Sequence, residues 1–545
     1  MRKFTKILFL VAVAFFLTGC VGPQKTEDTE QSKEGETEIP EITVFDVNSG
    51  EYQFDDRIAR EIMKQTGVKI NIMDPTDDVT EKVSLMLAYQ DYPDMILINM
   101  DNIQKYVEAG YLVDLEPYME RLPNVERMYG DVLNRLRTED GKLYYLSNWY
   151  GVDEDSSSAF QIRYDYLCEL VGKERADSNE PFTQDEFLDL LRRFQKKYPE
   201  SEGKTSLPLA LCTSLNYNTP LRGMYGMKNY YENNGKLYHL TRDPKYRELI
   251  LFLNQLYREG LLDKEWIVTQ RTLFSKKLTE GRVFATACAY WDLDKDRNQV
   301  KEKWGENADY YPYKVLGKGI SADETTYNGR STLGWDAIAV TDHCKNMDAV
   351  LKVIDFLASE EGQYLMLWGI EGEDWNYVDG KRTPDAAILA EALSDINQAK
   401  KNTGIRRWSW FIKNGLGSDG SPYDMMTKYE ISKEAKLGNE RFRTDRWDTS
   451  FYTNLDPASA TEEALIWKNV QEIYQKAYPR LIDASSEEEC LRLYDKMIAD
   501  MEVEGLSKAE KVITENYKKP VSYTHLDVYK RQLRGHTRSH PEHDG

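Results

Sequence analysis

The sequence predicts an α/β fold, and three observations predict it. Strand and helix patterns alternate through residues 41–99, as in a parallel sheet with covering helices. Similar patterns continue over most of the 545 residues, which is enough for two domains or one large two-lobed unit. An acidic, serine-rich loop at residues 151–158 separates two of these runs. We expect the chain to pass from one lobe to the other at this loop.

Local patterns predict the elements of the first lobe. A helix should end at Gly67, because glycine readily adopts the left-handed conformation that closes helices. The alternation of Val68, Ile70 and Ile72 predicts the strand that follows. We expect strands over residues 42–47, 68–72, 94–99 and 141–146, and helices over residues 55–66 and 79–90.

The later elements carry equally local signals. Asp243 and Pro244 are a helix cap and a first helical residue, and Gly260 is the expected end of that helix. Between them an apolar stripe recurs at helical spacing. We expect strands over residues 160–164, 207–212, 281–290 and 337–340, and helices over residues 181–198, 243–260 and 348–367 and from residue 461 onward.

These elements suggest a division into lobes. We expect residues 41–150 to form lobe 1, with residues 300–365 returning to it. Lobe 2 would comprise residues 151–299, with residues 366–520 returning to it. We find no internal repeat.

The N-terminus has the pattern of a secretory signal peptide. A basic start precedes an apolar run at residues 7–17, which is too short to span a bilayer comfortably. The run ends in Leu17-Thr18-Gly19-Cys20, which resembles the lipobox of bacterial lipoproteins. The resemblance implies a signal peptide over residues 1–19 and a lipid anchor on Cys20. The alternative is an ordinary signal peptide with a chance cysteine.

Both ends of the remaining chain are set apart by composition. Residues 20–40 are polar, with too few apolar side chains to fold, and we expect a flexible stalk.

With suitable codons, residues 521–532 are encoded by DNA that is nearly its own reverse complement, as when two sequencing adapters join. We therefore interpret residues 521–545 as an assembly artefact and exclude them from fold reasoning. The excluded residues contain the histidines His525, His536, His540 and His543.

Composition and spacing exclude several classes of function. The net charge of −21 argues against a nucleic-acid partner, which needs clustered Lys and Arg. The cysteines after Cys20 are far apart and form no Cys-x-x-Cys, so a zinc site is unsupported and a disulfide cannot be paired. Outside the excluded tail only His239 and His343 remain, and the chain has no P-loop and no Gly-x-Ser-x-Gly. We expect no cofactor, no metal and no enzymatic activity.

Three stretches carry a resemblance to a known family. They are Gly281-Arg282-Val283-Phe284-Ala285 with Tyr290-Trp291 after it, Gly334-Trp335-Asp336-Ala337-Ile338-Ala339-Val340, and Trp368-Gly369-Ile370-Glu371-Gly372-Glu373-Asp374-Trp375. In order and spacing they resemble the extracellular solute-binding proteins of carbohydrate ABC transporters. The resemblance covers residues 41–520. It implies a two-lobed periplasmic-binding-protein-like fold of type II, in which a hinge joins the lobes and the ligand lies between them.

Proteins bind sugars with the flat faces of aromatic rings and with polar side chains, so the candidate ligand residues are of these two kinds. The candidate stacking residues are Trp149, Trp291, Trp335, Trp375, Trp408 and Trp410, of which Trp291 matches a family position where an aromatic residue meets sugar. The candidate hydrogen-bonding residues are Asn48, Asn99, Asp101 and Glu371. A core position is the alternative for each tryptophan, and turn chemistry is the alternative for the residues after strands.

The sequence departs from some uronate-binding relatives at their calcium loop. The matching residues 199–208 lack most of the oxygen ligands and contain Lys204. A second acidic run, at Asp292, Asp294 and Asp296, has Arg297 where a calcium loop requires glycine. We therefore predict no calcium site.

The resemblance implies a lipid-anchored receptor on the outer face of the cell membrane. It would be a monomer that captures an oligosaccharide and delivers it to separate ABC permease subunits. Three alternatives stay open: a receptor of the same fold for a peptide or other solute, a surface glycosidase or lyase, and a sensor subunit.

Overall fold

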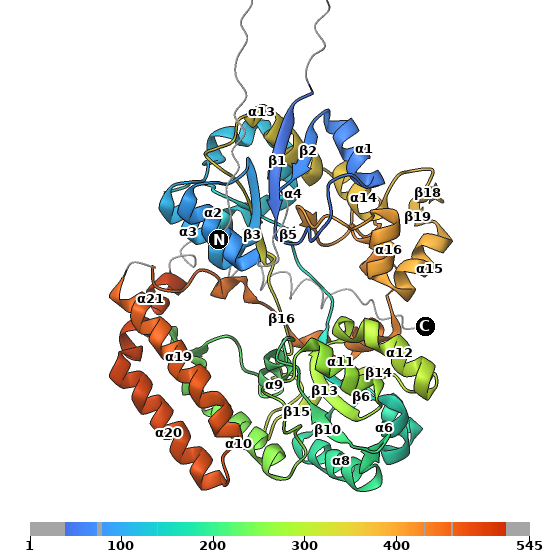
Figure 1. Cartoon of the computed structure of the whole chain (residues 1–545), viewed down its shortest axis with the longest axis vertical. Coiled ribbons are helices and arrows are strands. Elements are labelled where there is room, and N and C mark those ends of the chain that lie inside the picture. Colours follow the sequence, from blue (N-terminus) through green and yellow to red (C-terminus); the bar gives the residue numbers. More distant parts are fainter. Residues whose placement is uncertain (1–38, 74–78, 139, 430, 459–460, 519–545) are drawn as a thin grey trace, which may run out of the picture. The chain divides into compact units, whose positions relative to one another are not determined.

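A computed structural model of the chain describes residues 39–73, 79–138, 140–429, 431–458 and 461–518. The described residues from Pro40 onward form one compact unit with two main sheets, one in each of two lobes (Figure 1). The predictions for residues 1–38, which include the signal peptide and Cys20, lie outside the described residues, as does the excluded tail.

The first lobe is built on a five-stranded sheet in the order β2-β1-β3-β17-β4. Strands β2 and β3 run parallel to β1, as predicted, whereas β17 runs antiparallel to β3 and to β4. The carboxyl ends of β1, β3 and β4 therefore meet the amino end of β17 on one edge of the sheet. The strands are β1 (Glu41–Asp46), β2 (Lys69–Ile72), β3 (Met95–Asn99), β4 (Leu146–Ser147) and β17 (Asp336–Val340).

The helices of the first lobe begin and end at recognisable caps. Asp56 caps α1, whose end at Gly67, with φ of 62°, confirms the predicted stop. The helices are α1 (Arg57–Thr66), α2 (Val79–Tyr89), α3 (Met100–Ala109), η1 (Glu116–Arg121), α4 (Pro123–Tyr129), η2 (Gly130–Val132), α5 (Leu133–Leu136), α13 (Met347–Ala358), α14 (Glu360–Trp368), α15 (Ala386–Ser394), α16 (Ile396–Thr403) and α17 (Met425–Lys428).

The prediction of one helix over residues 348–367 was wrong. The chain forms α13 and α14, with a break at Ser359. Ser359 has an extended backbone, and its hydroxyl accepts a hydrogen bond from Gly362 N at 2.9 Å. The apolar periodicity continues across this break, because a serine that caps a new helix leaves no gap in the hydrophobic pattern. The strand expected over residues 141–146 is also shorter in the structure. Of those residues, only Leu146 belongs to a strand, β4.

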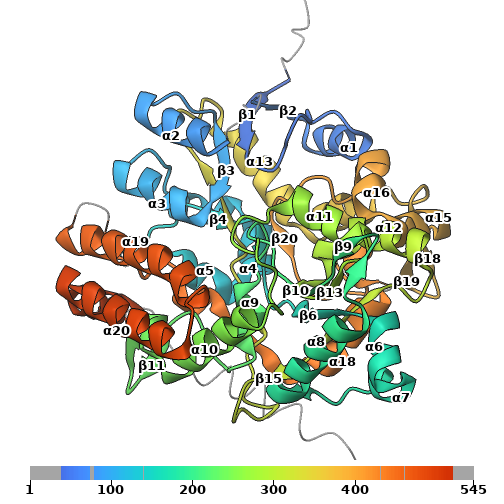
Figure 2. The same cartoon turned by 60° about the horizontal axis from the view of Figure 1, so that its bottom comes forward.

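The second lobe is built on a four-stranded sheet in the order β10-β13-β6-β14. Strands β10 and β13 are parallel, and β6 is antiparallel to both β13 and β14. Figure 2 shows helices α6 and α8 beside this sheet. The strands are β6 (Ser158–Arg163), β10 (Leu207–Ala210), β13 (Val283–Ala289) and β14 (Tyr310–Tyr313).

Helix α10 confirms its predicted cap, because the Asp243 side chain accepts a hydrogen bond from Lys245 N at 2.9 Å. The helices of this lobe are α6 (Tyr164–Val171), α7 (Lys173–Asp177), α8 (Gln184–Lys197), α9 (Asn218–Gly223), η3 (Leu240–Arg242), α10 (Pro244–Arg258), α11 (Arg271–Thr279), η4 (Tyr290–Leu293), α12 (Asp294–Trp304), α18 (Lys433–Arg441), η5 (Arg443–Asp445) and η6 (Thr449–Tyr452).

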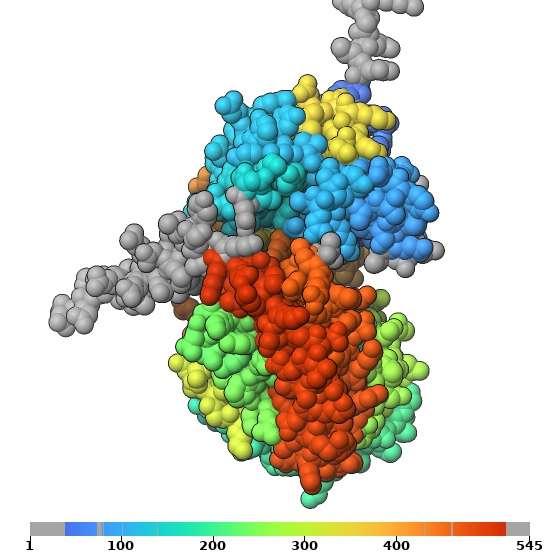
Figure 3. Space-filling model, turned by 90° about the vertical axis from the view of Figure 1, so that its left-hand side faces the viewer, coloured from blue at the N-terminus to red at the C-terminus, as the bar shows by residue number. Residues whose placement is uncertain are grey.

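Three long helices complete the second lobe, as the helical pattern after residue 461 predicts. They are α19 (Glu462–Ile482), α20 (Glu487–Glu504) and α21 (Leu506–Lys518). Figure 3 shows them in red over one face of the lobe. Buried Asn254 of α10 ties them to the lobe, since its Nδ2 donates to Ile482 O and Ala484 O at 3.0 and 2.7 Å.

Short two-stranded sheets lie between the larger elements. Three of them, β5 with β20, β16 with β21 and β7 with β15, join segments that are far apart in the sequence. The pairs are β5 (Trp149–Tyr150) with β20 (Ile412–Lys413), β16 (Asn328–Arg330) with β21 (Arg446–Asp448), β7 (Phe182–Thr183) with β15 (Val315–Leu316), β8 (Glu200–Ser201) with β9 (Lys204–Thr205), β11 (Tyr231–Asn233) with β12 (Lys236–Tyr238), and β18 (Trp375–Val378) with β19 (Lys381–Pro384).

The two main cores show where the chain crosses between lobes. Buried residues within 42–150 and 333–426 form one core, and buried residues within 159–327 and 442–509 form the other. This division differs from the expected one, since Tyr310–Tyr313 pairs with the second sheet and Trp368 lies in the first core. An amphipathic helix shows the same apolar stripe whichever sheet it covers, so the pattern alone does not assign it to a lobe.

Candidate functional site

Polar side chains gather around Asp336 at the strand ends of the first sheet. Asn48 follows β1, and its Nδ2 donates to Asp336 Oδ2 at 2.8 Å. Asn99 ends β3 opposite Asp336, and its side chain accepts a hydrogen bond from Asn102 N at 3.0 Å. Burial raises the pKa of Asp336 above its ordinary value. Asn48 and Asn99 therefore lie beside a buried carboxyl that the sequence analysis did not select, although Asp336 directly follows Trp335.

Trp335 presents the largest exposed aromatic surface at this edge. Its exposed fraction is 52%, whereas Trp149 behind it is only 7% exposed. The two rings lie 5.4 Å apart at 35°. Gly334, with φ of 67°, lets the backbone approach closely, because a Cβ there would lie 2.6 Å from Asn148 Oδ1. The sequence thus fixes Trp335 on a close-packed support while leaving much of its ring free.

A second aromatic residue stands at the corresponding strand end of the second lobe. Trp291 follows β13 and is 38% exposed. The guanidinium of Arg330 lies 4.9 Å from its ring centroid, a cation–π contact. Tyr290 beside it donates from its hydroxyl to Asp155 Oδ2 at 2.7 Å. Burial raises the pKa of Asp155 above its ordinary value.

The buried carboxylate of Asp153 joins all three crossings between the lobes. Asp153 lies in the first crossing, Arg330 in the second, and Lys428 where the third begins. Arg330 Nε donates to Asp153 Oδ2 at 3.1 Å, and Lys428 Nζ donates to Asp153 Oδ1 at 2.7 Å. Burial raises the pKa of Asp153, but the charges of Arg330 and Lys428 outweigh burial and hold it well below its usual range.

Charged groups continue from this cluster to the first aromatic pair. Arg406 lies 5.5 Å from the Trp149 ring centroid, and its Nε donates to Asp424 Oδ2 at 2.6 Å. Asp424 directly precedes α17, which ends at Lys428. We call this row of side chains the crossover site: Trp335, Trp149, Arg406, Asp424, Lys428, Asp153, Arg330 and Trp291.

Several buried polar atoms at or near the crossover site have no hydrogen-bond partner among the described residues. They are Asn148 Nδ2, Asp155 Oδ1, Asn414 Oδ1 and Asp424 Oδ1. A buried polar atom without a partner costs free energy, so such atoms in a native protein bond to water or to a ligand. The donors and acceptors here would suit the hydroxyl groups of a ligand.

Comparison with protein families decides the class of the molecule. Residues 57–372 match the family model described as bacterial extracellular solute-binding protein. This chain belongs to that family.

Relatives of this solute-binding protein include two proteins of Bacillus subtilis. Lipoprotein LipO is 23% identical over 394 residues, which are 70% of this chain and 75% of LipO. The polygalacturonan/rhamnogalacturonan-binding protein YtcQ is 23% identical over 387 residues, which are 69% of this chain and 74% of YtcQ. The fructooligosaccharide-binding protein FusA of Streptococcus pneumoniae is 22% identical and covers 58% of this chain and 60% of FusA.

Solved structures support the two-lobed fold of the solute-binding protein. The alginate-binding protein AlgQ2 without calcium matches with a TM-score of 0.68 at 17% identity, covering 88% of this chain and 98% of AlgQ2. FusA in complex with kestose matches with a TM-score of 0.62 at 16% identity, covering 89% of this chain and 100% of that one. At this level of identity the likeness shows the fold alone.

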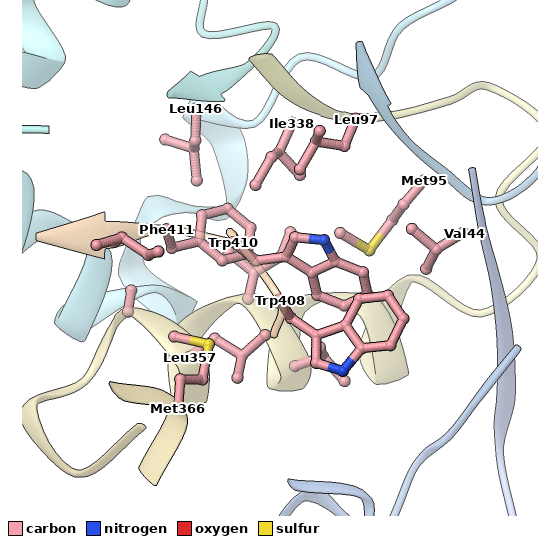
Figure 4. Close-up of a cluster of buried hydrophobic side chains, with 14 of the residues drawn as sticks. Val44, Met95, Leu97, Leu146, Ile338, Leu357, Met366, Trp408, Trp410 and Phe411 are labelled. Atoms are coloured by element: carbon pink, nitrogen blue, oxygen red, sulfur yellow. The ribbon is translucent and has the colours of Figure 1, made fainter. Parts of the chain in front are cut away.

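The other candidate tryptophans of the solute-binding protein lie in the core. Trp375 and Trp408 are 5% and 3% exposed, and Trp410 is 1% exposed. Figure 4 shows Trp408 and Trp410 among apolar side chains of β1, β3 and β17. Their indole N–H groups donate to Asp56 Oδ2 and Asp46 Oδ2, each at 2.8 Å. These rings have no face free for a sugar, so we leave the three out of the site.

The two remaining candidates, Asp101 and Glu371, do not enter the proposed site. Asp101 is the second residue of α3, and only its backbone position is described. Glu371 is exposed in the turn between α14 and β18. The proposed ligand site therefore consists of the crossover site together with Asn48, Asn99 and Asp336 beside it. Of these residues, the sequence analysis selected Asn48, Asn99, Trp149, Trp291 and Trp335.

The carboxylates of the β8–β9 hairpin do not fit a calcium ion. Glu202 Oε1 forms an ion pair with Lys303 at 2.7 Å, and Lys204 forms an ion pair with Glu280 of the neighbouring turn. Lysines thus neutralise the charges that calcium would need. Within the described ranges, no group of three or more His, Cys, Asp or Glu side chains is placed to hold a metal ion.

Two surface hollows of the second lobe lie away from the crossover site. One runs along α19 beside Trp467, and the other lies between the β11–β12 hairpin, α10 and α20. Neither is lined by a residue of the crossover site. Of the helices that the structure describes, none is both long enough and apolar enough to span a membrane.

Proposed function

We propose that this protein is the lipid-anchored, non-enzymatic substrate-binding component of an ABC importer. It captures an oligosaccharide at the crossover site, between the strand ends of its two lobes. It acts as a monomer, and separate permease subunits receive the ligand. The anchor on Cys20 holds it at the outer face of the cell membrane.

The half-exposed ring of Trp335 is the observation that carries this proposal. Its exposed fraction is 52%, and it stands at a strand edge with Asn48, Asn99 and Asp336. Sugars present flat C–H faces that pack on aromatic rings and hydroxyl groups that bond to carboxyl and amide groups. Carboxyl ends of strands are where open α/β sheets bind ligands.

The names of the relatives support a carbohydrate ligand. YtcQ is named for binding polygalacturonan and rhamnogalacturonan, and FusA for fructooligosaccharide. LipO is named as a lipoprotein, in keeping with the lipobox-like Leu17-Thr18-Gly19-Cys20 of this chain.

The crossings provide the mechanism. Asp153, Arg330 and Lys428 tie the three crossing segments together, so hinge motion would turn the lobes about this cluster. A ligand that contacts Trp335 on one lobe and Trp291 on the other stabilises the closed state, because only that state satisfies both contacts. Closure also excludes water and strengthens the polar contacts. The permease then distinguishes loaded from empty protein by this change.

One observation favours a second candidate function, a surface glycosidase. Asp153 and Asp155 have pKa values displaced in opposite directions, as in acid and nucleophile pairs. Both oxygens of Asp153 are engaged, however, by Arg330 and Lys428. A carboxylate held in this way is poorly placed to attack a sugar, so binding without reaction remains our proposal.

A thermal-shift screen tests the proposal. Residues 41–520 would be titrated with mono- and oligosaccharides, and each sugar that raises the melting temperature would be recovered for product analysis. We expect a concentration-dependent rise with oligosaccharides, because a ligand that binds only the folded state stabilises it. Intact recovered sugar supports a transport receptor. Degraded sugar would make the protein an enzyme, and no response to any sugar would contradict carbohydrate binding.

The anchor is tested by replacing Cys20 with alanine in the full-length chain. We expect the wild-type protein in the membrane fraction, carrying labelled fatty acid, and the Cys20→Ala protein without label and released from the membrane. Cys168→Ala is the matched control and should behave as wild type. Label retained by the Cys20→Ala protein would contradict an anchor at this residue.

A further inference from the structure

Three cationic side chains of the first lobe lie near one another, and one of them, Arg406, contacts Trp149. Lys400 lies in the last turn of α16, and Arg406 and Arg407 lie in the loop that follows. Such a group is unexpected in a chain of net charge −21. Like charges held together repel, so their placement needs a partner of opposite charge.

The three cations differ in how they are satisfied. Arg406 pairs with Asp424 at 2.6 Å. Arg407 lies 3.2 Å from the Tyr52 ring centroid and donates to Ser49 O at 3.1 Å. Carboxylates of Asp46 and Asp56 also act on Arg407, but their oxygens already bond to indole N–H and backbone N–H groups.

Lys400 is the cation that has no such partner. Within the described residues, no hydrogen bond and no ion pair reaches its ammonium group. Burial, together with the charges of Arg406 and Arg407, lowers the pKa of Lys400 to about 8 against the opposing charge of Asp424. These three are the charged groups that act on it, and the positive charges outnumber the negative.

Asp424 supplies a second and independent sign of a ligand. The residue is 3% exposed, and Arg406 occupies only its Oδ2. Its Oδ1 is buried without a hydrogen-bond partner among the described residues. A buried carboxylate oxygen of this kind suits a hydroxyl donor brought by a ligand.

The loop that positions these groups has an unusual backbone. Arg406 has φ of 57°, a left-handed conformation that costs a non-glycine residue about 1 kcal/mol or more. Its N–H donates to Met366 O at 2.7 Å, which fixes the conformation. The conformation directs Arg406 over Trp149, whose neighbour Trp335 is the exposed ring of the crossover site.

We infer that Lys400, with Arg406 and Asp424, forms a binding site for an acidic sugar. Lys400 would bind the carboxylate of a uronic acid unit, and Asp424 Oδ1 would accept a hydrogen bond from one of its hydroxyl groups. This inference rests on the proposed function and narrows its ligand class from oligosaccharides to oligosaccharides that carry carboxylates. It assigns charge selection to one residue that touches the ligand.

The test compares each acidic oligosaccharide with its own neutral methyl ester. Isothermal titration would use galacturonate, glucuronate and mannuronate oligomers, each paired with its ester, beside a neutral panel. We expect the wild-type protein to bind one acid at least 10-fold more tightly than its ester. Lys400→Met should remove that preference without weakening the ester, since methionine keeps the apolar stem of lysine.

Lys401→Met is the matched control, because Lys401 is exposed, adjacent and of equal charge. It should keep the preference of the wild-type protein. Affinity for the acid should also fall as pH rises above about 8, where Lys400 loses its proton, and Lys400→Met should abolish this dependence.

The outcomes separate the inference from the proposed function. Binding restricted to neutral sugars, or an acid preference that survives in Lys400→Met, would overturn the inference and leave carbohydrate binding intact. Equal losses in Lys400→Met and Lys401→Met would also overturn it, because they would show only a general charge effect. Failure of every sugar to bind would overturn both.

Discussion

Replacing Trp335 with alanine is expected to weaken oligosaccharide binding about 30-fold, equivalent to about 2 kcal/mol. The ring is 52% exposed and stands on Trp149, so it offers a flat apolar face to a sugar. Its loss removes the stacking contact while leaving the polar groups around Asp336 in place. Isothermal titration of wild-type and Trp335→Ala proteins with the sugar found by screening would measure the change.

Two features make this substitution a test of the site and not of the fold. Half of the Trp335 side chain is already in water, so its removal should change the melting temperature little. Tyr89→Ala on α2 is the control, since Tyr89 is 76% exposed and lies outside the crossover site. Wild-type affinity in the Trp335→Ala protein would place the ligand elsewhere.

The elements that sequence analysis predicted well are those with local causes. Helix α10 follows from Asp243, Pro244 and an apolar stripe that lie within one stretch of chain. Strand β1 and the end of α1 at Gly67 depend on neighbours in the same way. Each signal is read over a few residues, so no knowledge of the tertiary structure was needed.

Whether each tryptophan is buried or exposed depends instead on contacts with residues that are distant in the sequence. Trp408 and Trp410 fill the first core because their loop returns to the start of α1 and the end of β1, where Asp56 and Asp46 accept their N–H groups. Asp46 itself is buried, which raises its pKa to about 6. Nothing near residue 408 in the sequence distinguishes such a core tryptophan from an exposed one such as Trp335.

The charged part of the site had no sequence signal for the same reason. Asp153, Arg330 and Lys428 meet only because three crossings run through one place. Acidic and basic residues are abundant in this chain, so their types gave no information about which would pair. The spatial order of the crossings, which the apolar pattern leaves undetermined, decides this part of the site.

Replacing Lys314 with methionine is expected to lower the free energy of unfolding by about 3–5 kcal/mol. Lys314 Nζ donates to Asp445 Oδ1 at 2.6 Å, and the two side chains are 5% and 0% exposed. Burial raises the pKa of Asp445, and the charge of Lys314 opposes that effect. Without Lys314, a buried carboxylate would keep only hydroxyl partners such as Thr325 Oγ1 at 2.9 Å. Urea denaturation would measure the loss.

The loss of stability should arise because the Asp445 carboxylate is left buried without its cationic partner, and not because the attraction between Lys314 and Asp445 is lost. Lys314→Met with Asp445→Leu removes both charges, and we expect it to recover most of the stability. Lys476→Met breaks the exposed pair with Glu472, whose side chains are 72% and 48% exposed, and should cost less than about 1 kcal/mol. Asp445 directly precedes β21, which pairs with crossing strand β16. A stable Lys314→Met protein would therefore show that the third crossing is held to the second lobe by other contacts.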